Sequence, residues 1–242
     1  MAEGRAGNAS YKKLGIIGGL GPAATVYLYD RIVSLTDAAR DQEHLDITIL
    51  NRPQTPDRTA YLLGRSHEDF APVVCAAARD LVGLGCEVIC IPCMTSHAAV
   101  DEIERACAPA RLLNFPHVVA ANLRARGCRR VGILATTGTV TTGFLQRALA
   151  DDGLDTRVPA PEGQELVESL IYDDVKAGRP ADMSKFERAC DDLAAQGCDS
   201  VILGCTELPL IHAPETYRDM YVADSLDILA RAAITACGAP LR

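Results

Sequence analysis

A short motif that ends in a cysteine occurs twice in this chain. A Gly-Cys-Glu triplet at 85–87 leads through an apolar run to Cys93, and a Gly-Cys-Asp triplet at 197–199 leads through another to Cys205. Both copies predict a glycine that ends a helix, a buried strand, and a cysteine where that strand ends. Because open α/β sheets bind ligands at the carboxyl ends of their strands, we expect both thiols in one site.

Two opposed thiols suit the inversion of a carbon stereocentre. Inversion removes a proton from one face of the carbon and delivers a proton to the other, and the two bases exchange roles for the opposite enantiomer. A free thiol titrates near ~8.5, so a nearby helix N-terminus or cation suffices to make it a base at neutral pH. The pattern therefore predicts Cys93 and Cys205 as the catalytic residues of a two-base proton transfer.

A second repeated segment supports a duplicated chain. Residues 12–18 and 129–135 both have a basic pair, a short apolar strand and the start of a loop rich in glycine or threonine. The two segments are offset by 117 residues and the cysteine motifs by 112. Offsets that agree within the length of a loop indicate two homologous halves.

Several polar residues are candidates for holding an anionic substrate. Arg58 lies in a proline-bounded loop, where its guanidinium could pair with a carboxylate in two hydrogen bonds. Lys176 is one of only four lysines, and it could pair with a carboxylate or a thiolate. Thr136 and Thr139 belong to a turn after a strand, whose hydroxyl and amide groups suit an anion. The glycine-rich loop at 18–21 fits neither dinucleotide nor phosphate-loop patterns.

Composition excludes several classes of protein. The net charge of −8 over 242 residues gives a nucleic-acid role no electrostatic support. No apolar run approaches the roughly 20 residues that span a bilayer. Residues 1–10 lack the hydrophobic core of a signal peptide, so we expect a disordered tail or cloning remnant and a cytoplasmic protein.

The ten cysteines are expected to be reduced, because no secretory signal is evident. Cys90 and Cys93 have the spacing of a zinc-binding pair, but Cys90 lies within a predicted strand, where successive side chains point to opposite faces. We therefore predict no metal site.

Strand-like and amphipathic helical runs alternate along the chain. Strands are predicted at 14–17, 47–50, 88–91, 131–134 and 201–203, and helices at 23–35, 72–84, 98–107, 118–125, 143–150, 166–177, 184–195 and 225–237. A proline-rich loop is predicted at 51–58. This alternation predicts two parallel sheets, each flanked by helices. We expect the domain boundary near 112–117.

The motifs resemble the cofactor-independent aspartate/glutamate racemase family, with most similarity to its aspartate racemase branch. The matching segments, in chain order, are 16–22, 41–44, 53–59, Pro92-Cys93 with Thr95 and His97, 134–139, 171–178 and 203–207. Together they extend over nearly the whole chain.

The resemblance implies two pseudo-symmetric α/β domains, residues 11–115 with 223–242 and residues 116–222, with the active site in the cleft between them. It implies interconversion of L- and D-aspartate, or of glutamate, without pyridoxal phosphate or metal. Cys93 and Cys205 would be the catalytic thiols of a small dicarboxylic amino-acid substrate, and a homodimer is expected. The residues implied to bind the substrate are Gln54, Arg58, Met94, Thr95, Thr136, Thr139, Lys176 and Thr206.

One position departs from the family pattern. The family has asparagine after the first catalytic cysteine, and this chain has Met94. Methionine has no strong hydrogen-bonding group, and a lost polar contact in a buried site costs about 1–3 kcal/mol. Two alternatives follow: an isomerase or decarboxylase of a related dicarboxylate on the same scaffold, and a ligand-binding protein without catalysis. The retained pair of thiols counts against the decarboxylase, because the related decarboxylase branch needs only one of them, and against the protein without catalysis.

Overall fold

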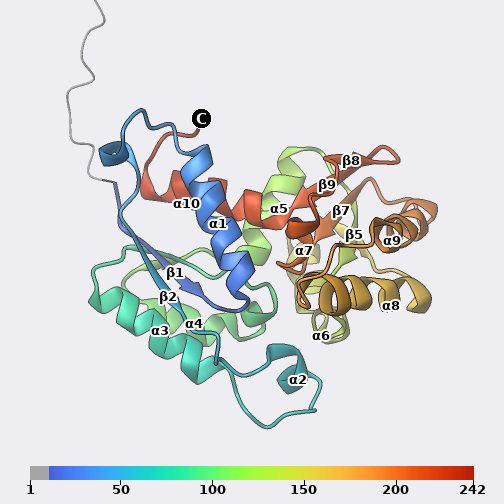
Figure 1. Cartoon of the computed structure of the whole chain (residues 1–242), viewed down its shortest axis with the longest axis horizontal. Helices are drawn as coiled ribbons and strands as arrows, with labels where there is room; N and C mark the ends of the chain where they lie inside the picture. The colour runs from blue at the N-terminus through green and yellow to red at the C-terminus, as the bar shows by residue number, and fades with distance from the viewer. Residues whose placement is uncertain (1–10) are drawn as a thin grey trace, which may run out of the picture.

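The computed structural model describes residues 11–242 and contains two mainly parallel sheets (Figure 1). The expected N-terminal tail, residues 1–10, lies outside the described residues. The first sheet has the order β2 (Ile47–Asn51), β1 (Leu14–Gly18), β3 (Val88–Cys90), β4 (Arg111–Leu112), all parallel. The second has the order β6 (Asp155–Arg157), β5 (Arg130–Leu134), β7 (Ser200–Leu203), β9 (Met220–Asp224), β8 (Thr216–Tyr217), with only β8 antiparallel.

The two sheets repeat one arrangement. In each, the first strand of the half lies between the second and third strands along the chain. The pairs β1–β3 and β5–β7 therefore occupy equivalent central positions. Every residue of β1 and β7 is buried, as expected for parallel strands covered by helices on both faces. The predicted class, two α/β units with mainly parallel sheets, is confirmed.

Helices cover both faces of the first sheet. Leu14 and Ile16 of β1 pack in the core formed with α1 (Pro22–Leu35) and α10 (Ser225–Cys237). Ile17, which points to the opposite face, packs with α3 (Ala71–Gly83) and α4 (Val100–Cys107). This alternation along β1 is the two-residue period of a strand, and Figure 1 shows the two helix layers on either side of the sheet.

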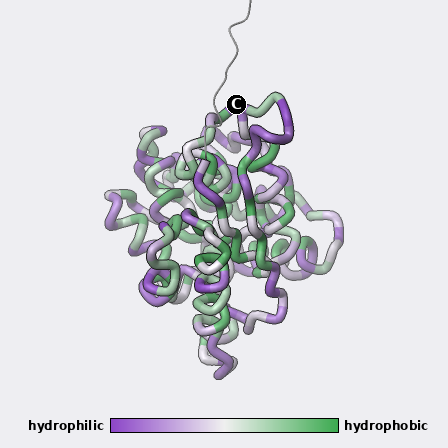
Figure 2. Tube along the Cα trace, turned by 90° about the vertical axis from the view of Figure 1, so that its left-hand side faces the viewer, coloured by the Kyte–Doolittle hydropathy of each residue, from purple (hydrophilic) through white to green (hydrophobic). Residues whose placement is uncertain are grey.

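The second sheet is covered in the same way. The helices α5 (Phe115–Ala125) and α7 (Phe144–Asp151) pack on the face that carries Val131 and Ile133. The helices α8 (Pro161–Ser169) and α9 (Met183–Ala195) pack on the face that carries Leu134. Hydrophilic stretches lie mainly at the periphery of the trace (Figure 2).

A glycine at the same place in each half lets a helix approach the sheet closely. A Cβ on Gly15 of β1 would lie 3.0 Å from Leu81 of α3. A Cβ on Gly132 of β5 would lie 2.6 Å from Leu193 of α9. A side chain at Gly132 would force Leu193 to move, and one at Gly15 would press tightly on Leu81. The two glycines align in the repeated segment, so the duplication extends to the packing.

The final helix joins the two halves. α10 packs against α1, β3 and α5, and its residues share one core with residues of both sheets. The division into residues 11–115 with 223–242 and residues 116–222 stays a prediction, because strand pairing does not reveal which parts fold independently.

Several elements differ from the sequence-based expectation. The predicted loop at 51–58 ends in a short helix, α2 (Arg58–Leu62), capped by the Asp57 carboxylate, which accepts a hydrogen bond from the Ala60 amide at 3.0 Å. The predicted helix at 166–177 is α8 followed by a π-helical segment, η3 (Leu170–Val175). The remaining short elements are η1 (Asp41–Glu43), η2 (Thr95–Ala99), α6 (Thr137–Thr142) and η4 (Leu208–Ile211). Within residues 11–242, no helix has the length and apolar character needed to cross a membrane.

Candidate active site

One pocket receives residues from both halves at the carboxyl ends of the central strands. Leu20 follows β1 and Cys93 follows β3, while Thr136 follows β5 and Cys205 follows β7. This is the edge at which parallel α/β sheets place ligands. The free volume is about 30 Å³, room for about two waters. The enclosed free space of the pocket is therefore small in this conformation.

Cys93 lies on a tight turn between β3 and η2. Its amide donates a hydrogen bond to the Ile91 carbonyl at 2.7 Å, and its carbonyl accepts one from His97 Nδ1 at 3.0 Å. Burial lowers the pKa of His97 to about 4, so the imidazole is neutral at physiological pH. His97 contacts the backbone of Cys93, so its evident role is to hold the turn that presents the thiol.

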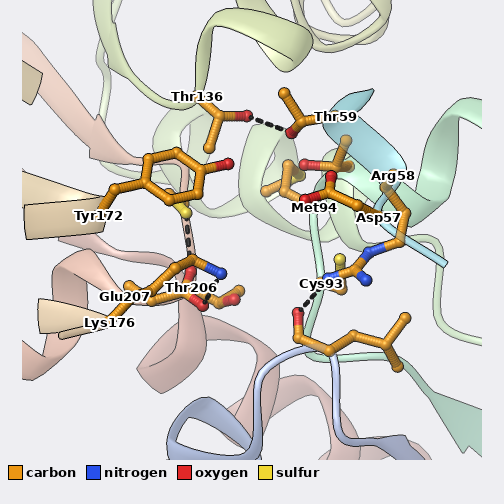
Figure 3. Close-up of a pocket in the computed structure, with 13 residues that line it drawn as sticks. Asp57, Arg58, Thr59, Cys93, Met94, Thr136, Tyr172, Lys176, Thr206 and Glu207 are labelled. Carbon is orange, nitrogen blue, oxygen red and sulfur yellow. Dashed lines mark hydrogen bonds and ion pairs between the residues drawn. The ribbon is translucent and has the colours of Figure 1, made fainter. Parts of the chain in front are cut away.

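Arg58 lies beside Cys93 on the same wall of the pocket (Figure 3). Its terminal nitrogens donate to the carbonyl oxygens of Pro56 at 3.1 Å and Leu20 at 3.1 Å. Burial alone would lower the pKa of Arg58, but the Cys93 sulfur and nearby carboxylates raise it overall. These carbonyls hold the guanidinium next to Cys93, while Arg58 Nε has no hydrogen-bond partner, so the cation keeps donor capacity for a carboxylate.

The opposite wall carries a chain of three polar groups. The Cys205 thiol donates to Glu207 Oε2 at 2.8 Å, and Lys176 Nζ lies 2.8 Å from Glu207 Oε1. Burial, reinforced by Glu207, raises the pKa of Cys205 well above its ordinary value, and Lys176 offsets part of the rise. Lys176 follows the π-helical segment, and its Nζ lies 5.4 Å from the centre of the Tyr172 ring. Cys205 is therefore a thiol that donates a hydrogen bond to a carboxylate, whereas Cys93 lies beside a cation.

Threonine hydroxyls connect the halves above the pocket. Thr95 Oγ1 lies 3.0 Å from Thr139 Oγ1, and Thr139 Oγ1 lies 3.2 Å from Thr136 Oγ1. Thr59 of α2 donates to Thr136 at 3.4 Å (Figure 3). The Thr136 hydroxyl also caps α6 by accepting from the Thr139 amide. These contacts set the positions of two loops that bound the pocket.

The structure brings most of the predicted site residues together. Those that line the pocket are Cys93, Cys205, Arg58, Met94, Thr95, Thr136, Lys176 and Thr206. Gln54 does not line it, because it lies on an exposed turn before α2. Thr139 is buried behind the lining and reaches the site through Thr95 and Thr136.

Five lining residues are absent from the sequence-based set: Leu20, Asp57, Thr59, Tyr172 and Glu207. Glu207 is the most consequential, since it contacts a thiol and a lysine. In the sequence, the position of Glu207 two residues after Cys205 could have marked it as a candidate. In the described part of the chain, no group of three or more His, Cys, Asp or Glu side chains is placed to hold a metal.

The comparison with known families agrees with this arrangement. A model of Asp/Glu/Hydantoin racemases matches residues 17–233. The chain belongs to the Asp/Glu/Hydantoin racemase family. This match confirms the family that the sequence motifs indicated.

Its similarity to individual family members extends over the whole fold. The aspartate racemase of Picrophilus torridus is 29% identical and superposes with a TM-score of 0.81 over 96% of both chains. The broad specificity amino-acid racemase RacX of Bacillus subtilis is 21% identical over 92% of this chain and 96% of its own. A glutamate racemase of Corynebacterium kroppenstedtii is 31% identical over 61% of this chain. That match spans 51% of the glutamate racemase, so the chain spans about half the length of such curated relatives.

Proposed function

We propose that this racemase-family protein interconverts the L and D enantiomers of aspartate, or of glutamate, by α-proton transfer between two thiols without pyridoxal phosphate. The observation that carries the proposal is that Cys93 and Cys205 line one pocket from equivalent strands of the two halves. A base on each side of the α-carbon is what inversion requires.

The charges around the pocket support an acidic amino-acid substrate. Arg58 and Lys176 both line it, and each is a cation that a substrate carboxylate could approach. The two walls are contributed by residues of the predicted units 11–115 with 223–242 and 116–222, so the proposed site is an interdomain cleft. A homodimer belongs to the same proposal, by similarity to the family.

Proton NMR in D₂O tests this function directly. Reduced protein, without added pyridoxal phosphate, is expected to remove the α-proton signal of L-aspartate or L-glutamate and to form the D enantiomer. Cys93→Ala and Cys205→Ala should each abolish both changes. Cys128→Ala is the matched control, because Cys128 is only partly buried and does not line the pocket. Full activity in either pocket variant would refute the two-base mechanism.

A second candidate rests on Met94. Its side chain is 1% exposed and lines the pocket next to Cys93, so it places an apolar group where an amino substituent would favour a polar one. Isomerisation or decarboxylation of a dicarboxylate that lacks the amino group fits this feature. Turnover of maleate or a substituted malonate, with no reaction of amino acids, would identify that activity.

A further inference from the structure

Glu207 is a buried carboxylate with two different partners. It is 5% exposed, and its two oxygens contact the Cys205 thiol and the Lys176 ammonium, each at 2.8 Å. Figure 3 shows it on the same wall as Lys176 and Tyr172, opposite Arg58 and Cys93. A carboxylate in contact with a reacting thiol can exchange a proton with it.

The Glu207 carboxylate lies close to a helix N-terminus. A Cβ on Gly21 would lie 3.1 Å from Glu207 Oε1, and Gly21 is the N-cap of α1. The carboxylate therefore lies at the amino end of a 14-residue helix, whose dipole stabilises a negative charge. The absence of a side chain at Gly21 leaves room for the carboxylate.

The other charged groups divide into two sets. Tyr172 of the π-helical segment and Lys176 just after it lie near Cys205, and Asp57, Arg58 and Cys93 line the opposite wall. Arg58 is fixed beside Cys93 by backbone carbonyls. The two thiols thus have neighbours of different charge: the Arg58 cation lies beside Cys93, and the Glu207 carboxylate contacts Cys205.

We propose, within the racemase mechanism above, that Glu207 makes the two thiols unequal by keeping Cys205 protonated as the acid, so that Cys93 beside Arg58 is the base of the resting protein. For the opposite enantiomer Cys205 must act as base. Its S–H bond then breaks, the electron pair stays on sulfur, and an O–H bond forms at Glu207 Oε2, while Cys93 takes a proton from solvent. The Cys205 thiolate then removes the α-proton, Cys93 delivers its proton to the other face, and Glu207 returns its proton to solvent, which restores the resting state.

Lys176 has the opposite influence on Cys205. Its positive charge favours the thiolate, whereas the Glu207 carboxylate favours the thiol. Its side chain is 33% exposed, against 7% for Glu207, so Lys176 is the member of the pair that an entering carboxylate can engage. If a substrate carboxylate draws Lys176 away from Glu207, the thiolate of Cys205 loses its stabilising cation, and Glu207 then favours the protonated thiol more strongly.

Alkylation of the two thiols tests this inference without any turnover. Each variant is treated with iodoacetamide over a range of pH, and mass spectrometry gives the ratio of Cys205 to Cys93 labelling, in which Cys93 reports access to the pocket. Glu207→Gln should raise this ratio at neutral pH by about tenfold, as expected for a thiol pKa lowered by one unit. Lys176→Gln should lower it.

The matched controls are Glu165→Gln and Lys185→Gln. Glu165 is an exposed residue of α8, Lys185 pairs with Asp174 at 2.8 Å, and neither lines the pocket. Both controls should leave the ratio unchanged. An unchanged or lower ratio in Glu207→Gln would overturn the inference. A higher labelling ratio in both Glu207→Gln and Lys176→Gln would also overturn it, because that result is expected if each substitution only loosens the wall around Cys205.

The two hypotheses fail separately. Opposite shifts in the two variants, in a protein that exchanges no α-proton of aspartate or glutamate, would support the role of Glu207 and reject the racemase. Racemisation with no shift in labelling would support the racemase and reject the role of Glu207.

Discussion

The hydroxyl oxygens of Thr95 and Thr139 lie 3.0 Å apart, although the two residues follow strands of different sheets. Both residues are buried, and the contact continues through Thr136 to Thr59. A buried hydroxyl without a partner is costly. These contacts therefore hold the two walls of the pocket at a defined separation, which a reaction between opposed thiols requires.

Replacing Thr139 by valine should weaken this link. The substitution keeps the shape of the side chain but leaves the Thr95 and Thr136 hydroxyls without one partner, at a cost of about 1–3 kcal/mol in the free energy of unfolding. Urea unfolding monitored by circular dichroism gives the value. Thr235→Val is the control, because the Thr235 hydroxyl bonds only the Arg231 carbonyl on an exposed helix face. Equal losses in both variants would show that the link contributes nothing specific.

Met94→Asn should shift the protein toward amino-acid substrates. The asparagine supplies a donor and an acceptor next to Cys93, and a recovered polar contact of about 1–3 kcal/mol corresponds to one to two decades in kcat/KM. The measurement compares kcat/KM for aspartate between the variant and the parent protein. Met94→Leu keeps the site apolar and should leave the value within a few fold. A gain in Met94→Leu equal to that in Met94→Asn would point to side-chain size as the cause.

His97 should make the protein sensitive to mild acid. Burial lowers its pKa to about 4 in the folded protein, below the value of about 6.5 for an unfolded chain. The unfolded chain therefore binds a proton more readily, so this contribution to stability is complete above about pH 6.5 and is lost as the pH falls toward 4. His97→Gln, which can still donate to the Cys93 carbonyl, should flatten the melting temperature across this interval. An identical slope in both proteins would contradict this assignment.

The ion pair between Asp174 and Lys185 should make the stability of the protein depend on pH in a lower range than His97 does. The Lys185 ammonium 2.8 Å away lowers the pKa of Asp174 in the folded protein. Stability from this pair is present above the pKa of an unfolded aspartate, about 3.9, and is lost as the pH falls through the lower folded value. Asp174→Asn should therefore lower the melting temperature at pH 7 and converge with the parent protein in strong acid. A constant difference at all pH values would mean that the loss comes from packing.

The central strands could be predicted because a fully buried strand is recognisable from its run of apolar residues. β1 and β3 are continuous apolar runs, and β5 and β7 are apolar after their first residues, Arg130 and Ser200, as parallel strands covered on both faces require. Of the edge strands, β2 is also predicted, at 47–50, whereas β4, β6 and β8 carry no such signal. β6 consists of Asp155, Thr156 and Arg157, and it is a strand only because β5 offers its backbone groups for pairing.

The residues of the site also differ in how clearly the sequence indicates them. Cys93, Cys205 and Lys176 could be singled out by residue type and position, because thiols at strand ends and a rare lysine stand out from the chain. Tyr172 could not, because its role depends on where side chains from distant segments point, and Glu207 was indicated only by its position two residues after Cys205. The π-helical turn before Lys176 is also a tertiary outcome, since the run from Leu166 follows an ordinary helical pattern.

The position of α10 has a consequence for synthesis on the ribosome. The first half of the chain emerges before the second, but Leu14, Ile16 and Leu28 complete their core with Leu229 and Ile234 of α10, which is made much later. A domain cannot acquire its native stability before its core residues are available. The first half must therefore wait with an incomplete core until Ser225–Cys237 has left the ribosome. Premature termination before this helix would leave that apolar surface exposed to aggregation.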